Sequence, residues 1–172
     1  MGMTAVANDS GALAQLSEYD RALPRKRLAA GVLFFDAGGR VLLVDPVYKE
    51  PWEIPGGGVE WDESPKAGAT REVKEELGLS LTLGRLLGMD WVGPRPGRSE
   101  GINAVFDGGA LSAEQVAGIR LQAEELRGLE FVPVERVRER LIPLLARRVE
   151  ACARAREEGT TVYLENGVPA LD

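Results

Sequence analysis

The segment from Gly56 to Gly78 constrains the fold more than any other part of the sequence. It begins with three successive glycines, which disfavour a regular helix and favour an extended, tightly turning backbone. Ser64 is a suitable N-cap, Pro65 fits the first position of a helix, and Gly78 suits the residue that follows the last turn. The sequence therefore predicts a tight turn that leads into a helix over residues 65–77.

One face of the predicted helix is acidic. At about 100° per residue, Glu72, Glu75 and Glu76 fall within an arc of about 100°, beside an apolar stripe made of Ala69, Val73 and Leu77. The carboxylates repel one another by a few tenths of a kcal/mol per pair, and a divalent cation would remove that repulsion. Acidic exposed faces are common on helices, so this spacing alone does not identify a site. The nearby Glu63 and the three glycines, which let a backbone carbonyl approach an ion or a phosphate closely, favour one.

Composition excludes several kinds of chemistry. The 172 residues include no histidine and one cysteine, Cys152, which excludes histidine-based zinc sites, Ser-His-Asp triads, Cys-His dyads and an internal disulfide. A metal site must then consist of oxygen ligands, which select Mg²⁺, Mn²⁺ or Ca²⁺. The net charge of −6 opposes binding to nucleic acid or to an anionic membrane. A ligand with phosphate groups therefore requires local basic side chains or a cation.

The composition indicates one domain over residues 25–172, preceded by a flexible arm over residues 1–24 with a short helix near residues 13–21. The sequence has no run of about eighteen apolar residues and no secretion signal, so we expect a cytoplasmic protein. The arm and a long C-terminal helix could contribute to a homodimer, and the sequence leaves monomer and dimer open.

The rest of the chain alternates short strands with a few helices. Leu28–Phe35 and Arg40–Asp45, joined by a glycine turn, predict a β-hairpin. Further strands are predicted over residues 79–92, 101–106, 119–122, 129–132 and 161–164. Helices are predicted over residues 112–118 and 134–158, and Pro143 divides the second into a short and a longer helix.

The glutamate helix is part of a longer pattern. Gly57 is followed after five residues by Glu63, and after seven more by the run Arg71-Glu72-Val73-Lys74-Glu75-Glu76-Leu77-Gly78-Leu79. This pattern resembles a complete Nudix box, and the resemblance to the Nudix hydrolase family extends over about residues 28–142. It implies a Nudix-like α/β/α sandwich, with a mixed β-sheet between helices and a loop-helix-loop catalytic motif.

The resemblance also implies a divalent-metal-dependent hydrolase. In the family, a metal-activated water attacks a phosphorus of a nucleoside diphosphate linked to another moiety, while Mg²⁺ or Mn²⁺ neutralises phosphate oxygens. Glu63 is then a supporting carboxylate, and Arg71, whose guanidinium can grip a carboxylate through two hydrogen bonds, orients the cluster. The metal ligands that the resemblance implies are Glu72, Glu75, Glu76 and the backbone carbonyl of Gly57.

The general base and the substrate contacts stay open, because family members differ in both. Glu124 and Glu125 precede a predicted strand, and we favour Glu125 as the base. Trp52 suits a core position better than a base stack, for which Tyr48 and Trp91 are further candidates. Loop cations that could offset phosphate charge are Lys49, Arg95 and Arg98.

We consider three functions for these residues. The first is hydrolysis of the diphosphate bond in a small nucleotide-like substrate, for which every box residue is present. The second is a non-catalytic nucleotide-binding or sensor module, which typically has a damaged box. The third is an isomerase that acts on a diphosphate ester, which normally requires histidine ligands that this chain lacks.

Overall fold

One mixed sheet runs through residues 15–170, the part of the chain that the computed structural model describes. Its strands are β1 (Arg27–Phe35), β2 (Val41–Pro46), β3 (Gly56–Gly58), β4 (Leu86–Val92), β5 (Gly101–Ala110), β6 (Leu126–Val132), β7 (Val162–Glu165) and β8 (Val168–Pro169). The strand order is β6-β2-β1-β5-β4-β7-β8, and β3 pairs with β1 off this path. β1 is parallel to β5 and antiparallel to β2 and β3, which makes the sheet mixed.

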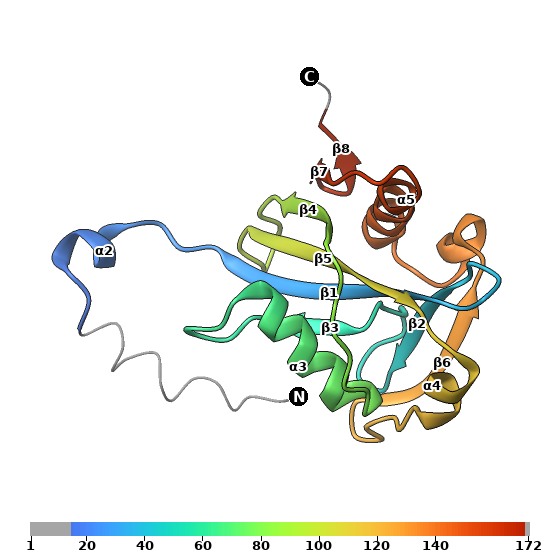
Figure 1. Cartoon of the computed structure of the whole chain (residues 1–172). Coiled ribbons are helices and arrows are strands. Elements are labelled where there is room, and N and C mark those ends of the chain that lie inside the picture. Colours follow the sequence, from blue (N-terminus) through green and yellow to red (C-terminus); the bar gives the residue numbers. More distant parts are fainter. Residues whose placement is uncertain (1–14, 171–172) are drawn as a thin grey trace.

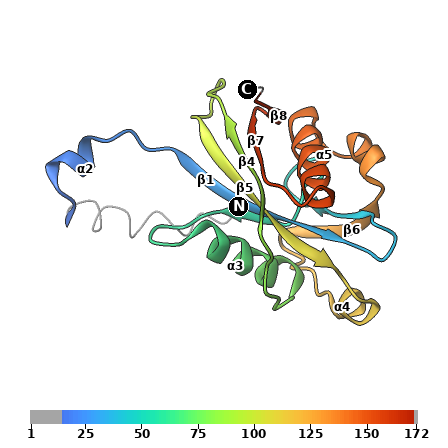
Figure 2. The ribbon, with the colours of Figure 1, turned by 45° about the horizontal axis from the view of Figure 1, so that its top comes forward.

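Helices cover both faces of the sheet, as Figures 1 and 2 show. The helices of the described chain are α2 (Glu18–Ala22), α3 (Pro65–Leu77), α4 (Ala113–Gly118), the 3₁₀ helix η1 (Val134–Glu139) and α5 (Pro143–Glu157), and the two faces are covered mainly by α3 and α5. α3 packs over a core cluster that includes Val32 and Phe34, whereas the cluster under α5 includes Leu33 and Phe35. Successive side chains of β1 point to opposite faces, so one apolar strand serves both cores. The predicted α/β/α sandwich is confirmed.

The capped helix forms where the sequence predicts it. The Ser64 hydroxyl accepts a hydrogen bond from the Ala67 amide at 3.2 Å, and Gly78 ends α3 with a left-handed φ of 68°. Three residues face the core and are buried: Ala69, Val73 and Leu77. This orientation leaves the acidic face of α3 beside the edge of the sheet, where the box loop passes.

The triple glycine forms β3, which lies beside the first half of β1. Gly56 pairs with Gly31, and Gly58 pairs with Ala29. Gly56 has a φ of 140°, and a Cβ on it would lie 2.3 Å from the carbonyl oxygen of Ala30. A side chain here would force the two strands apart, so the approach of the box loop to the sheet requires glycine.

The predicted hairpin is confirmed as β1 and β2, but two strand predictions are wrong. The strand predicted over residues 79–92 begins only at Leu86, because the apolar residues before it are buried under α3 in an irregular segment. Residues 119–122 form no strand, since the amides of Arg120 and Gln122 bond instead to the last carbonyls of α3. The apolar pattern of both segments reflects packing against α3 rather than pairing in the sheet.

The other predicted elements form with shifted ends. The strand predicted over residues 129–132 begins three residues earlier, as β6, and the C-terminal strand is β7. The helices predicted over residues 112–118 and 134–158 correspond to α4 and to η1 followed by α5. Pro143 stands at the start of α5, where the missing amide proton of proline costs no hydrogen bond.

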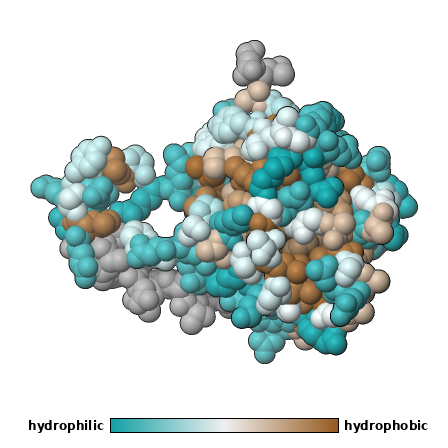
Figure 3. All heavy atoms as spheres, in the orientation of Figure 1, coloured by the Kyte–Doolittle hydropathy of each residue, from teal (hydrophilic) through white to brown (hydrophobic). Residues whose placement is uncertain are grey.

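α2 stands away from the body of the molecule (Figures 1 and 3). The helix predicted near residues 13–21 corresponds to α2 in part, and its first residues lie outside the described part of the chain. Within residues 15–170, no helix is long and apolar enough to cross a membrane.

Candidate active site

The guanidinium of Arg71 connects the carboxylates of the box. Its Nε and Nη2 atoms each lie 3.0 Å from an oxygen of Glu63, which is the two-point grip expected for arginine. Its Nη1 atom donates to Glu72 at 2.9 Å and to Glu75 at 3.2 Å. Nη2 also donates to the carbonyl oxygen of Gly58 at 3.0 Å, so one side chain ties the box loop to α3.

These contacts change the proton affinities of the groups involved. The hydrogen bonds from Arg71 hold the pKa of Glu63 below its ordinary value and thereby keep that carboxylate ionised. The hydrogen bonds to Glu63, together with the bond to the Glu72 carboxylate, raise the pKa of Arg71 above its ordinary value. Arg71 is therefore a fixed positive charge within a group of acids.

Glu76 is the most deeply placed acid of the box. Only 8% of the residue is exposed, and its Oε2 atom accepts a hydrogen bond from the Gly56 amide at 2.9 Å. Burial raises the pKa of Glu76 to about 8, with further contributions from the charges of Glu72, Glu125 and Glu53. Several carboxylates therefore lie close enough to Glu76 to oppose its ionisation.

Gly57 leaves room for the carboxylate of Glu72. A Cβ on Gly57 would lie 2.5 Å from Cδ and from Oε1 of Glu72, closer than any real contact, whereas a Cβ on Gly58 would meet nothing within 4 Å. Burial raises the pKa of Glu72, and the hydrogen bond from Arg71 only partly opposes this effect. The missing side chain at Gly57 brings backbone and carboxylate oxygens together in one small volume.

Glu125 approaches the box from another part of the chain. It is half-buried in the turn before β6, and its carbonyl oxygen accepts a hydrogen bond from the Val47 amide at 2.8 Å. The charge of Glu125 raises the pKa of both Glu72 and Glu76, so the three carboxylates lie near one another. Its neighbour Glu124 is exposed.

Glu53 is an acid of the site that the box pattern does not include. It forms an isolated bridge with Val44 of β2, and its charge contributes to the raised pKa of Glu76. Its carboxylate also accepts a hydrogen bond from Lys49 and forms an ion pair with that side chain. The sequence contained a signal for Glu53, because it lies in the extended segment immediately before the glycines.

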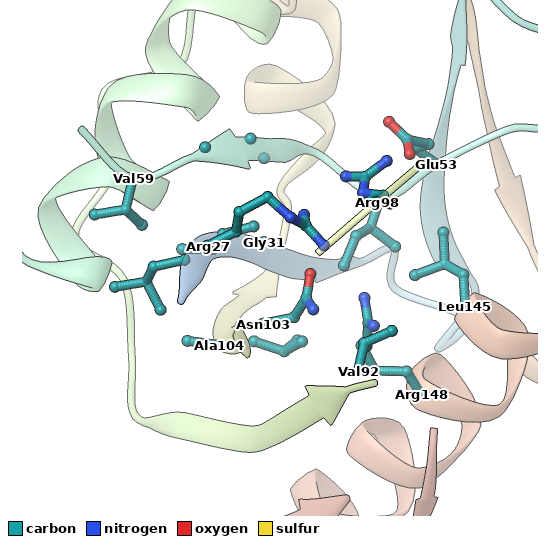
Figure 4. A pocket seen from close by; sticks show the side chains of 18 of the residues that line it. Arg27, Gly31, Glu53, Val59, Val92, Arg98, Asn103, Ala104, Leu145 and Arg148 are labelled. Atoms are coloured by element: carbon teal, nitrogen blue, oxygen red, sulfur yellow. The ribbon is translucent and has the colours of Figure 1, made fainter. Parts of the chain in front are cut away.

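A cavity of about 850 Å³ opens beside the box glycines, and Figure 4 shows its interior. This volume falls in the range of small-molecule sites. Its lining includes Gly56 to Gly58 and Glu53 at one end and Leu145 and Arg148 of α5 at the other. Asn103 of β5 lies between these ends.

The predicted substrate residues have different positions relative to this cavity. Four predicted cations and aromatic residues line it: Tyr48, Lys49, Arg95 and Arg98. Trp52 packs against the core under α5, with its ring 5.4 Å from the Arg140 guanidinium carbon, so its position is that of a core residue. Trp91 donates a hydrogen bond from its indole nitrogen to Glu100 at 2.8 Å.

A family model described as NUDIX domain matches residues 25–152. The chain belongs to the Nudix hydrolase family. Among curated relatives, diphosphoinositol polyphosphate phosphohydrolase 2 of Rattus norvegicus is 45% identical over 76 residues, which cover 44% of this chain and 42% of the relative. The match thus spans less than half of that protein.

Solved structures share the Nudix fold over most of the chain. The MutT protein of Methanosarcina mazei Go1 is 26% identical with a TM-score of 0.62, and the match covers 80% of this chain and 99% of that protein. A UDP-X diphosphatase is 19% identical with a TM-score of 0.68, covering 91% of this chain and 75% of that protein. The family predicted from the box pattern is confirmed.

The box acids suit a hard divalent cation chemically but do not surround a common point in this arrangement. Within residues 15–170, no three Asp, Glu or Cys side chains are grouped as ready ligands. Arg71 holds Glu72 and Glu75, and the Gly56 amide holds Glu76. The observations that fit a cation are the space at Gly57 and the raised pKa of Glu76, which burial and the repulsion from nearby carboxylates produce together.

The raised pKa of Glu76 predicts that the metal-free protein loses stability as the pH rises. The pKa is about 8 in the fold against an ordinary value of 4.5, so the folded state binds the proton more tightly than the unfolded state. This contribution to stability is complete below pH 4.5 and is lost as the pH rises through 8. Urea denaturation in a chelating buffer from pH 5.5 to 8.5 should show the loss.

Two variants separate Glu76 from the other acids. Glu76→Gln should flatten the pH dependence and leave the protein more stable than the wild type at pH 8.5. Glu75→Gln, at a side chain that is 52% exposed, should keep the wild-type slope. A slope that is the same in Glu76→Gln and in the wild type would contradict the assignment.

Proposed function

We propose that this Nudix protein is a Mg²⁺- or Mn²⁺-dependent hydrolase of the diphosphate bond in a small nucleotide-like substrate. The observation that carries the proposal is the gathering of Glu72, Glu76 and Glu125 beside the box glycines, which themselves line a cavity of about 850 Å³. The curated relative is named as a phosphohydrolase of diphosphoinositol polyphosphates and a structural neighbour as a diphosphatase. Both names describe reactions at diphosphate groups.

The residues that would hold the ion are Glu72, Glu75, Glu76 and the carbonyl of Gly57. When bound, the cation neutralises phosphate oxygens and lowers the pKa of an attacking water. Arg71 fixes the orientation of the carboxylates, because its four hydrogen bonds to acids and one to the Gly58 carbonyl restrict how each side chain can rotate. Glu63, which Arg71 keeps ionised, does not hold the ion itself and supports the cluster by accepting two hydrogen bonds from Arg71.

Glu125 is the proposed general base. Its carboxylate faces the box acids from a turn anchored at Val47, so one of its oxygens can accept the proton that the attacking water loses. Tyr48 lies at the same end of the cavity, 60% exposed. Partial burial of the ring, together with the charges of Glu53, Glu76 and Glu125, raises its pKa, so its phenol stays neutral and can donate a hydrogen bond.

A substrate screen tests the reaction. ADP-ribose, a UDP-sugar, a diphosphoinositol polyphosphate and a nucleoside triphosphate are incubated with Mg²⁺ or Mn²⁺ in ¹⁸O-water, and the products are identified by mass spectrometry. We expect cleavage of at least one compound, with ¹⁸O in a phosphate product, and loss of cleavage with a chelator or in Glu76→Gln. Binding of these compounds without cleavage under either ion would favour a binding module instead.

The two neighbouring glycines test the geometry of the box. Gly57→Ala places a Cβ against the Glu72 carboxylate, and a displacement of about 1 Å at a reacting centre can lower kcat/KM by about 100-fold. Gly58→Ala adds the same methyl group where no atom lies within 4 Å and should have a much smaller effect. Thermal unfolding shows whether both variants are folded. Equal losses in the two variants would contradict the role given to the space at Gly57.

The neighbouring acids Glu124 and Glu125 test the general base. Glu125→Gln should lower kcat by about 100-fold or more, because general base catalysis typically contributes that much, and should change KM less. Glu124→Gln removes a similar charge one residue away, on an exposed side chain, and should leave kcat close to the wild type. A decrease of less than about threefold in Glu125→Gln would remove Glu125 from the mechanism.

A further inference from the structure

Arg148 of α5 is a buried arginine, and most of its hydrogen-bond donors have no partner within residues 15–170. Its side chain is 9% exposed, and its Nε atom donates to Asp90 of β4 at 2.7 Å. Its two terminal nitrogens make no hydrogen bond to any residue in 15–170, and the side chain extends from α5 into the cavity (Figure 4). The two terminal nitrogens thus offer four charged N–H donors to the cavity.

Asp90, the partner of Arg148, already accepts a hydrogen bond at each of its carboxylate oxygens. Asp90 is fully buried, and its other oxygen accepts the Gly167 amide at 3.0 Å. Gly167 lies in the turn between β7 and β8, beyond the residues that the family model matches. A buried ion pair contributes little net stability by itself, so stability alone gives no reason for a guanidinium of which four of the five N–H donors have no partner within residues 15–170. Those donors match the geometry of a phosphate.

Asn103 extends this polar end toward the box. It pairs directly with Asp90 on one side and with Ala29 on the other, and Ala29 pairs with Gly58 of the box loop. Three steps between neighbouring strands at about 4.8 Å each separate Asp90 from Gly58 by about 14 Å. Side chains reach into the cavity from both ends, so two anions bound there would be separated by a spacer about the size of one ring.

Three more arginines surround the mouth of the cavity. Arg95 and Arg98 exchange backbone hydrogen bonds across the tight turn between β4 and β5, so they lie directly opposite each other, where like charges are unfavourable. Burial and the charges of Arg98 and Arg95 lower the pKa of Arg27. None of the three has a carboxylate partner within residues 15–170, although the chain carries a net charge of −6. This clustering of positive charge suits an anionic ligand.

We propose that Arg148, with Asn103 and the arginines at the mouth, binds a phosphate monoester that the substrate carries in addition to the diphosphate. The inference rests on the proposed function, because the diphosphate of the same molecule would lie at the Nudix box. The substrate class is then a diphosphate ester whose ring, a nucleoside or a polyol, bears a further phosphate. Phosphates joined through one bridging oxygen are too close together to occupy both ends.

Ligands that have no diphosphate bond test the subsite without hydrolysis. In a buffer with Mg²⁺, adenosine 3′,5′-bisphosphate should bind at least about tenfold more tightly than adenosine 5′-monophosphate by calorimetry, since a hydrogen bond to a charged group contributes that much. Inositol hexakisphosphate tests a polyol spacer in the same way. Tight binding of the bisphosphate or of inositol hexakisphosphate supports the subsite if that binding depends on Arg148. The ligand that binds more tightly shows whether the spacer is a nucleoside or a polyol.

Two variants separate binding from stability. Arg148→Met leaves Asp90 buried and unpaired and should destabilise the fold, whereas the double variant Asp90→Asn/Arg148→Met removes both charges and should regain much of the melting temperature. The double variant should lose the advantage of the bisphosphate over the monophosphate. A double variant that is folded and retains this advantage would overturn the proposal and leave the pair a structural contact.

Turnover gives the second measurement. Coenzyme A and dephospho-coenzyme A differ only in a 3′-phosphate on the adenosine, so their ratio of kcat/KM isolates the subsite. We expect the ratio to exceed one in the wild type and to approach one in the double variant. A ratio of one in the wild type would exclude a nucleoside spacer. The calorimetry with inositol hexakisphosphate would then decide whether a polyol is the spacer. Failure to cleave any diphosphate, with Arg148-dependent binding retained, would refute the proposed function and not the subsite.

Discussion

The site depends on one guanidinium. Arg71 is bonded to Glu63, Glu72 and Glu75 and to the carbonyl of Gly58, so it joins the box loop, the start of α3 and the acidic face of that helix. Without a positive charge at this point, the carboxylates would repel one another in a half-buried setting where water screens them poorly. A lysine could supply the charge but not the planar set of donors that reaches four groups.

Close packing of backbone makes this network possible. β3 can lie against β1 only because Gly56 has no side chain, and the carboxylate of Glu72 occupies the space that a side chain on Gly57 would need. The caps at Ser64 and Gly78 then fix where α3 begins and ends relative to that loop. Gly56 and Gly57 therefore act through close approach to the sheet and to the acids rather than through flexibility.

The sequence predicted the parts of the molecule that depend on local chemistry. Helix caps, a glycine hairpin and the spacing of the box act over a few residues, so α3, the β1–β2 pair and the acids of the box could be identified. Arg148 could not, because its importance arises from contacts between distant segments. The strands wrongly predicted over residues 79–85 and 119–122 failed for the same reason, since their apolar residues pack against α3.

The cavity carries both signs of charge in a protein that is acidic overall. Glu53 and Glu63 line it beside the box glycines, whereas Arg148 and the three arginines at the mouth make other parts of its wall positive. A polyanionic substrate on its own would therefore be attracted to the arginines and repelled from the glutamates. The same molecule can place its diphosphate at the box only when a cation has reversed the charge there. If the proposed function holds, the divalent ion sets the orientation of the substrate as well as the reactivity of the water.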